Sequence, residues 1–84
     1  MYTVVIERKV QKEIADIPKL YQQQIVQAIY NLQTNPRPTN CKKLSGSKND
    51  YRIRVADYRI IYSIEDNILT VFVITVGYRK NIYR

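Results

Sequence analysis

The stretch "YRIRVADYRIIYSIEDNILTVFVITV" (Tyr51 to Val76) decides the fold, because apolar and polar residues alternate through most of it with a period of two. That period is typical of β-strands that bury one face. The segments "AD" and "EDN" interrupt the alternation and predict turns, so the stretch is predicted to form a meander of three strands. The last strand, "ILTVFVITV", is apolar on both faces and is predicted to lie centrally in the sheet.

The residues before this stretch predict one more strand and two helices. "YTVVIE" (Tyr2 to Glu7) is short and β-branched, which favours an opening strand. Apolar residues then recur at helical spacing before and after Pro18, which predicts a helical hairpin with Pro18 in the first turn of its second helix. The polar stretch Thr34–Asp50 is predicted to be a surface loop. The apolar helical positions are Val10, Ile14, Ile17, Ile25, Ala28, Ile29 and Leu32.

The order β-α-α-β-β-β predicts an α+β fold in which the helical hairpin packs on one face of a small, mainly antiparallel sheet. A chain of 84 residues has surface enough for a single core, so residues 1–84 are predicted to form one domain. No apolar run approaches the roughly 20 residues that a membrane span requires, and the first residues lack the pattern of a signal peptide. We therefore expect a cytoplasmic protein with no membrane partner.

The composition narrows the chemistry that is open to the chain. It has one cysteine, Cys41, and no histidine, so an internal disulfide and an ordinary zinc site are excluded, and no metal or cofactor is predicted. Acid-base chemistry would need carboxylate, lysine, tyrosine or arginine. The formal net charge of +7 favours a polyanionic partner, although many small basic proteins are simply solvated.

The cations of the meander are predicted to gather on one face. On a strand Arg52 and Arg54 point the same way, and a tight turn at "AD" would bring Arg59 to that face. Arg79 and Lys80 lie just beyond the last strand. Arginines on a strand are often only solvated, but several that converge beside tyrosines favour binding of single-stranded nucleic acid.

The second half of the chain, "KKLSGSKNDYRIRVADYRIIYSIEDNILTVFVITVGYRKNIYR" (Lys42 to Arg84), resembles the RelE toxins of the RelE/ParE superfamily. Members share a K-L-x-G loop, a "Y-R-I-R" strand, a "D/G-Y-R-I-I-Y" strand and a "V-F-V-I-x-V-G-x-R" strand, in that order. The resemblance implies a RelE-like, microbial-RNase-like fold. It also implies a metal-independent endoribonuclease of a type II toxin–antitoxin system that cuts mRNA in the ribosomal A site and inhibits translation.

The resemblance assigns residues and partners as well. The catalytic positions would be Arg54, Arg59, Arg79 and Tyr83, with RNA also bound by Arg52, Lys42, Lys43, Lys80 and Arg84. The segment "VGYRKNIYR" (Val76 to Arg84) would then be half of the active site. The implied partners are the mRNA, the ribosome and a cognate antitoxin, in a toxin–antitoxin heterotetramer.

One departure from the family bears on the mechanism. Other members commonly carry lysine where this chain has Arg52 and Arg54, and arginine in practice cannot act as a general base. The proton of the ribose 2′-hydroxyl would then pass to a phosphate oxygen, to water or to Tyr83. Two alternatives stay open, because the same fold serves ParE toxins, which inhibit DNA gyrase without cutting RNA, and would also suit a catalytically weak RNA-binding relative.

Overall fold

The period-two stretch forms three consecutive antiparallel strands in the computed structural model, which describes residues 1–78. The register places Val55 opposite Tyr58, so the first turn contains only Ala56 and Asp57. Ala56 adopts φ 53°, the left-handed conformation that a two-residue hairpin turn demands. The predicted second turn is a short 3₁₀ helix, η1 (Asp66–Ile68). The three strands are β3 (Asp50–Val55), β4 (Tyr58–Glu65) and β5 (Thr70–Tyr78).

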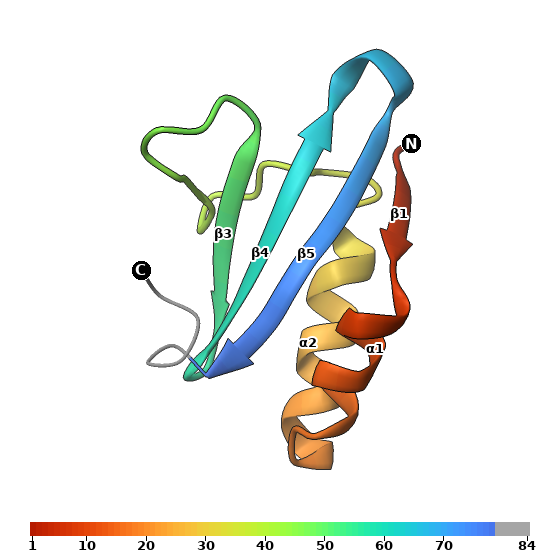
Figure 1. Ribbon diagram of the computed structural model, residues 1–84, viewed down its shortest axis with the longest axis vertical. Helices are drawn as coiled ribbons and strands as arrows, with labels where there is room; N and C mark the ends of the chain where they lie inside the picture. Colours follow the sequence, from red (N-terminus) through yellow and green to blue (C-terminus); the bar gives the residue numbers. More distant parts are fainter. Residues whose placement is uncertain (79–84) are drawn as a thin grey trace.

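The sheet has five strands in the order β1-β5-β4-β3-β2 (Figure 1). The opening strand β1 (Thr3–Ile6) pairs in parallel with β5, so β5 has a neighbour on each side, as its apolar sequence predicted. Strand β2 (Lys42–Lys43) corrects the prediction that Thr34–Asp50 is all loop. Two residues are too few to show a period, and their pairing depends on β3.

The helical hairpin consists of α1 (Arg8–Ala15) and α2 (Lys19–Asn31), which lie on one face of the sheet (Figure 1). Pro18 is the residue immediately before α2 rather than a member of its first turn. The Gln22 side chain donates hydrogen bonds of 3.2 and 2.8 Å to the carbonyl oxygens of Ala15 and Ile17. These bonds satisfy two of the carbonyls left without a partner where α1 ends.

The core lies between the hairpin and the sheet. Each apolar helical position predicted from the sequence packs there, six of them buried and Ala28 partly buried. From the sheet, the buried apolar residues are those that share one face of β3, β4 and β5, which confirms the alternation read from the sequence. They are Ile53, Ile60, Tyr62, Ile64, Val71, Val73 and Val76.

Glu13 of α1 covers the edge of β5 where β1 no longer pairs with it. The Glu13 carboxylate accepts hydrogen bonds from the backbone N–H of Val76 at 2.9 Å and from the Thr75 hydroxyl at 3.1 Å. Lys9 forms an ion pair with Glu13 at 3.1 Å and donates to the Ile74 carbonyl oxygen. Burial acts to raise the pKa of Glu13, but these hydrogen bonds outweigh it and hold the pKa below its ordinary value.

Replacing Glu13 by alanine is expected to lower the free energy of unfolding at pH 7 by about 1 to 2 kcal/mol, because a strand N–H loses its acceptor. The pH dependence follows from the lowered pKa in the folded state. The contribution of Glu13 is fully present above its unfolded pKa, near 4.5, and is lost as the pH falls through the lower folded value.

Urea denaturation from about pH 7 down to pH 3 measures this effect. Wild type should lose stability more steeply than Glu13→Ala below pH 4.5. The matched control is Glu7→Ala, because Glu7 is exposed and its side chain makes no capping hydrogen bond. Equal pH slopes for wild type and Glu13→Ala would contradict the assignment.

Candidate nucleic-acid interface

The face of the sheet opposite the helices, which we call the open face, carries four cations in two adjacent rows. The register places Arg54 of β3 directly opposite Arg59 of β4, as the tight turn predicted. The adjacent row on this face holds Lys42 of β2 opposite Arg52 of β3. We call these four residues the cation patch.

The two arginines of the first row differ in exposure. Arg54 is exposed, whereas Arg59 is only 7% exposed. Arg59 is shielded because it is the second residue of β4 and has neighbouring strands on both sides, although it does not belong to the apolar core. Residues directly opposite on antiparallel strands have Cβ atoms about 5 Å apart, and like charges at that spacing are unfavourable.

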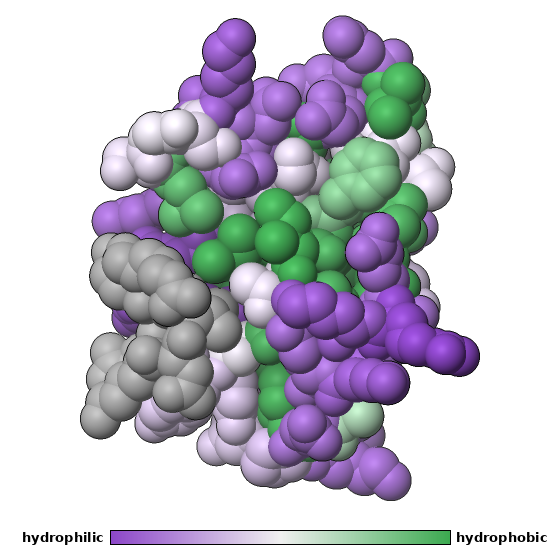
Figure 2. Space-filling model, viewed as in Figure 1, coloured by the Kyte–Doolittle hydropathy of each residue, from purple (hydrophilic) through white to green (hydrophobic). Residues whose placement is uncertain are grey.

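Apolar residues cover the part of the open face that borders the cation patch. Val5 of β1 lies opposite Phe72 of β5, and Ile61 of β4 lies beside Arg52 in the register. Ile74, 41% exposed, occupies a β-bulge in β5 and follows Phe72 on this face. We call Val5, Ile61, Phe72 and Ile74 the apolar strip. None of the four belongs to the core. Figure 2 looks onto this face and shows apolar surface across its middle.

The structure separates some of the residues that the sequence grouped together. Lys43 lies opposite Tyr51, so its row belongs to the helix side of the sheet and not to the cation patch. Both lysines of β2 are exposed. The other four predicted site residues, Arg79, Lys80, Tyr83 and Arg84, lie outside the described residues, so their roles stay predictions.

Arg37 is a residue that sequence patterns did not reveal, and it fastens the loop before β2 to the sheet. Its guanidinium forms an ion pair with Asp66 at 2.9 Å and donates to the Tyr51 hydroxyl at 3.2 Å. It also lies over the Tyr51 ring, 5.3 Å from the centroid. Tyr2 donates to the same Asp66 carboxylate at 2.6 Å. No periodic sequence pattern predicts these contacts, because Arg37 lies in an irregular loop outside any helix or strand.

The contacts around Asp66 shift the pKa values of both Asp66 and Tyr2. The hydrogen bond from Arg37, followed by that from Tyr2, holds the pKa of Asp66 below its ordinary value. The hydrogen bond to Asp66 is in turn the main reason that the pKa of Tyr2 is raised. Asp66 is therefore an ionised acceptor in a structural ion pair, and Arg37 is engaged away from the cation patch.

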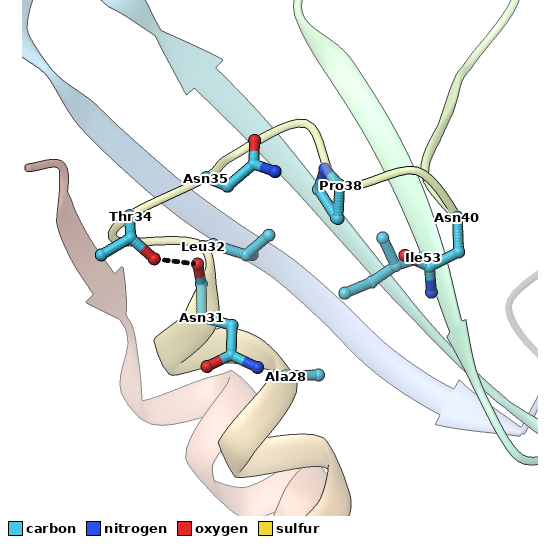
Figure 3. Close-up of a pocket in the computed structure, with 8 residues that line it drawn as sticks. All are labelled: Ala28, Asn31, Leu32, Thr34, Asn35, Pro38, Asn40 and Ile53. Carbon is cyan, nitrogen blue, oxygen red and sulfur yellow. Dashed lines mark hydrogen bonds between the residues drawn. The ribbon is translucent and has the colours of Figure 1, made fainter.

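A pocket of about 300 Å³ lies on the other side of the sheet, between the end of α2 and β3 (Figure 3). Leu32 and Ile53 contribute apolar surface, and three asparagines and Thr34 contribute polar groups. None of the lining residues is charged, so the pocket lacks the charge complementarity that a phosphate requires. Its lining residues are Ala28, Asn31, Leu32, Thr34, Asn35, Pro38, Asn40 and Ile53.

Metal ligands and membrane spans are both lacking in the part of the chain that the structure describes. Within residues 1–78, there is no group of three or more histidine, cysteine, aspartate or glutamate side chains that could hold a metal ion. Neither of the two helices there has the length and apolar character needed to cross a membrane.

Comparisons with known proteins identify the family. Residues 4–83 match the family described as the ParE toxin of the type II toxin–antitoxin system parDE. The chain belongs to the RelE/ParE superfamily. It is 31% identical over 75 residues to a protein of Methanocaldococcus jannaschii inferred to be toxin RelE1, and the match covers 83% of each chain. It is therefore a RelE-like toxin of a type II toxin–antitoxin system.

Solved structures of RelE toxins share the fold across nearly the whole chain. RelE in the archaeal RelE–RelB complex from Pyrococcus horikoshii has a TM-score of 0.84 and 27% identity, covering 95% of this chain and 97% of that one. The isolated Escherichia coli RelE toxin has a TM-score of 0.80 and 27% identity, covering 93% and 84%. The α+β fold implied by the RelE-like sequence motifs is thus confirmed.

Proposed function

We propose that this toxin is a ribosome-dependent endoribonuclease that cuts mRNA in the A site and so inhibits translation in the cytoplasm. The observation that carries the proposal is the direct opposition of Arg54 and Arg59 on the open face. Guanidiniums on two directly opposed residues can offer paired N–H donors that remain charged at cellular pH, which suits a phosphodiester and its more highly charged transition state.

The proposed reaction is attack of the ribose 2′-oxygen on the adjacent phosphorus. The new O–P bond replaces the bond to the 5′-oxygen of the next nucleotide, which leaves a 2′,3′-cyclic phosphate and a 5′-hydroxyl. Arg59 and Arg79 stabilise the charge that develops on the phosphate oxygens, and Arg54 positions the phosphate. No metal or cofactor takes part in this scheme.

The proton transfers are assigned to groups other than arginine. The 2′-hydroxyl loses its proton to a phosphate oxygen, to water or to Tyr83, because the arginines stay protonated. The departing 5′-oxygen takes up a proton from water or from the group that accepted the first proton, which gives the 5′-hydroxyl. Arg52 and Lys42 bind the neighbouring RNA backbone from the adjacent row of the open face. Lys43, Lys80 and Arg84 are proposed to contact RNA farther from the reacting phosphate.

An antitoxin is proposed to cover the same face. The RelE toxins from Pyrococcus horikoshii and M. jannaschii were solved in complexes with RelB antitoxins. In this chain the apolar strip borders the cation patch, so a partner segment with apolar and acidic side chains would bury the strip and neutralise the arginines. Antitoxin and RNA would then exclude each other. We propose a heterotetramer of two toxins bridged by two antitoxins.

Inhibition of DNA gyrase is the second candidate function, because the matching family is described as ParE toxin. We rank it second, since a gyrase inhibitor has no need of two opposed arginines that face a phosphate.

Mapping of mRNA 5′ ends in a reconstituted translation reaction tests the function. We expect new 5′ ends within the A-site codon and loss of translation, with supercoiling by gyrase unaffected. Arg54→Glu is expected to abolish both effects on translation, because it reverses the charge beside the phosphate. The matched control is Arg8→Glu, which changes an exposed arginine at the start of α1. Intact mRNA together with inhibited gyrase would overturn the proposal in favour of the second candidate.

A further inference from the structure

Six of the seven tyrosines within residues 1–78 form two groups with different surroundings, and Tyr30 of α2 belongs to neither. Tyr2, Tyr51 and Tyr62 belong to the structural contacts around the loop before β2, and their hydroxyls bond to other residues of the protein. The second group, the tyrosine rim, consists of Tyr21 of α2, Tyr58 of β4 and Tyr78 of β5. Within residues 1–78 no hydroxyl of the tyrosine rim makes a hydrogen bond.

The tyrosine rim is a contiguous set of rings. The centroids of Tyr21 and Tyr58 are 5.6 Å apart, and Tyr58 and Tyr78 meet edge to face at 5.6 Å and 82°. Tyr21 and Tyr58 pack against the core, whereas Tyr78 does not and is 39% exposed. Tyr58, which itself packs on Tyr21, therefore restrains the Tyr78 ring, and this restraint lowers the entropy that Tyr78 loses when it binds a ligand.

The rim lies next to the cation patch at one end of the sheet. Tyr58 pairs with Tyr78, and the adjacent register pair is Arg59 with Gly77. Tyr78 is therefore one residue beyond the row that contains the two opposed arginines. Side chains in adjacent rows point to opposite faces of the sheet. A single-stranded RNA whose phosphate contacts the two arginines would therefore reach the Tyr78 ring by passing around the end of the sheet. Figure 1 shows the end of β5 beside the β3–β4 turn.

We propose that Tyr78 is a stacking platform for a nucleobase next to the phosphate held by Arg54 and Arg59. The inference rests on the proposed function and adds a positioning residue to it. A tyrosine ring stacks on any base without reading its hydrogen-bonding edge, so Tyr78 would place the RNA backbone rather than select a sequence. The ring is needed for this role and the hydroxyl is not.

The absence of tryptophan from the chain permits a direct optical test. In Tyr78→Trp the single indole reports stacking, because a base that stacks on it quenches its fluorescence. We expect quenching by an adenosine dodecamer and weaker quenching by a uridine dodecamer. Inorganic polyphosphate, which is anionic but has no bases, should bind without quenching. Tyr30→Trp is the matched control, because Tyr30 is 53% exposed on α2 and is not part of the rim.

Affinity for a labelled adenosine dodecamer tests the same role without the indole. Tyr78→Phe should bind as wild type does, and Tyr78→Ala should bind about 5- to 100-fold more weakly, the range measured for single stacked bases. A melting temperature for each variant separates this loss from unfolding.

The outcomes distinguish failure of the inference from failure of the proposed function. RNA binding that Arg54→Glu abolishes but Tyr78→Ala leaves unchanged would overturn the stacking role and leave the function standing. An unquenched indole in the RNA complex would do the same. Failure of the wild-type chain to bind the dodecamer at low salt would overturn the stacking role, whereas cleavage within the A-site codon in the translation reaction tests the proposed function separately.

Discussion

Replacing Arg59 by alanine is expected to slow cleavage of ribosome-bound mRNA by about 100- to 1,000-fold, the usual loss when one donor to a developing oxyanion is removed. Arg59 is 7% exposed, so its guanidinium acts where water screens charge less than at the surface. Its position opposite Arg54 would allow both side chains to contact the same phosphate under the proposed function. Single-turnover cleavage of a message with a defined A-site codon measures the effect.

The burial of Arg59 requires controls for folding. Arg59→Lys keeps the charge but loses the forked donor, so we expect cleavage between that of wild type and Arg59→Ala. Arg8→Ala, at the exposed start of α1, should cleave as wild type does. Circular dichroism and antitoxin binding report whether each variant is folded. Wild-type cleavage by folded Arg59→Ala would remove Arg59 from the mechanism.

The sequence predicted the main elements of the fold because local patterns determine them. Alternation along β3 and β4 marks the residues that face the helices, and a two-residue turn leaves few possible registers. The opposition of Arg54 and Arg59 could therefore be predicted. The helix positions were equally clear, since Ile25 and Ile29 lie one turn apart and are both fully buried.

Features that depend on distant residues were not predictable in this way. Strand β2 exists only because Lys42 and Lys43 pair with β3. The bulge at Ile74 shifts the register within β5, and no local signal marks it. Arg37 and Asp66 are 29 residues apart in sequence, and neither belongs to a periodic segment. The burial of Arg59 likewise follows from its neighbours across the sheet rather than from its place in the sequence.

The open face carries two features that destabilise an isolated domain. Arginines directly opposite one another and exposed apolar side chains both cost stability in an isolated domain. Under the proposed function an RNA phosphate would offset the first cost, and an antitoxin with apolar and acidic side chains would offset both. We therefore infer that the sheet is stabilised mainly from its helix side, where the core lies and where the loop before β2 is fastened.

Tyr62→Ala is accordingly expected to destabilise the fold far more than Glu13→Ala does, with a loss of about 3 to 5 kcal/mol in the free energy of unfolding. The Tyr62 ring is fully buried and stacks on Tyr51 with centroids 6.0 Å apart. Burial, and after it the neighbouring Cys41 thiol, raises the pKa of Tyr62, so its hydroxyl stays protonated. That hydroxyl donates to the Pro36 carbonyl oxygen at 2.8 Å.

Tyr62→Phe separates the ring from the hydroxyl. It keeps the stacking on Tyr51 and leaves the Pro36 carbonyl without this donor, so we expect a loss of only about 1 to 2 kcal/mol. Tyr30→Ala removes a ring that is 53% exposed and should change stability by about 0.5 kcal/mol or less. Urea denaturation at neutral pH measures all three. If Tyr62→Ala were no less stable than Tyr30→Ala, the ring of Tyr62 would not be what joins the loop before β2 to the core.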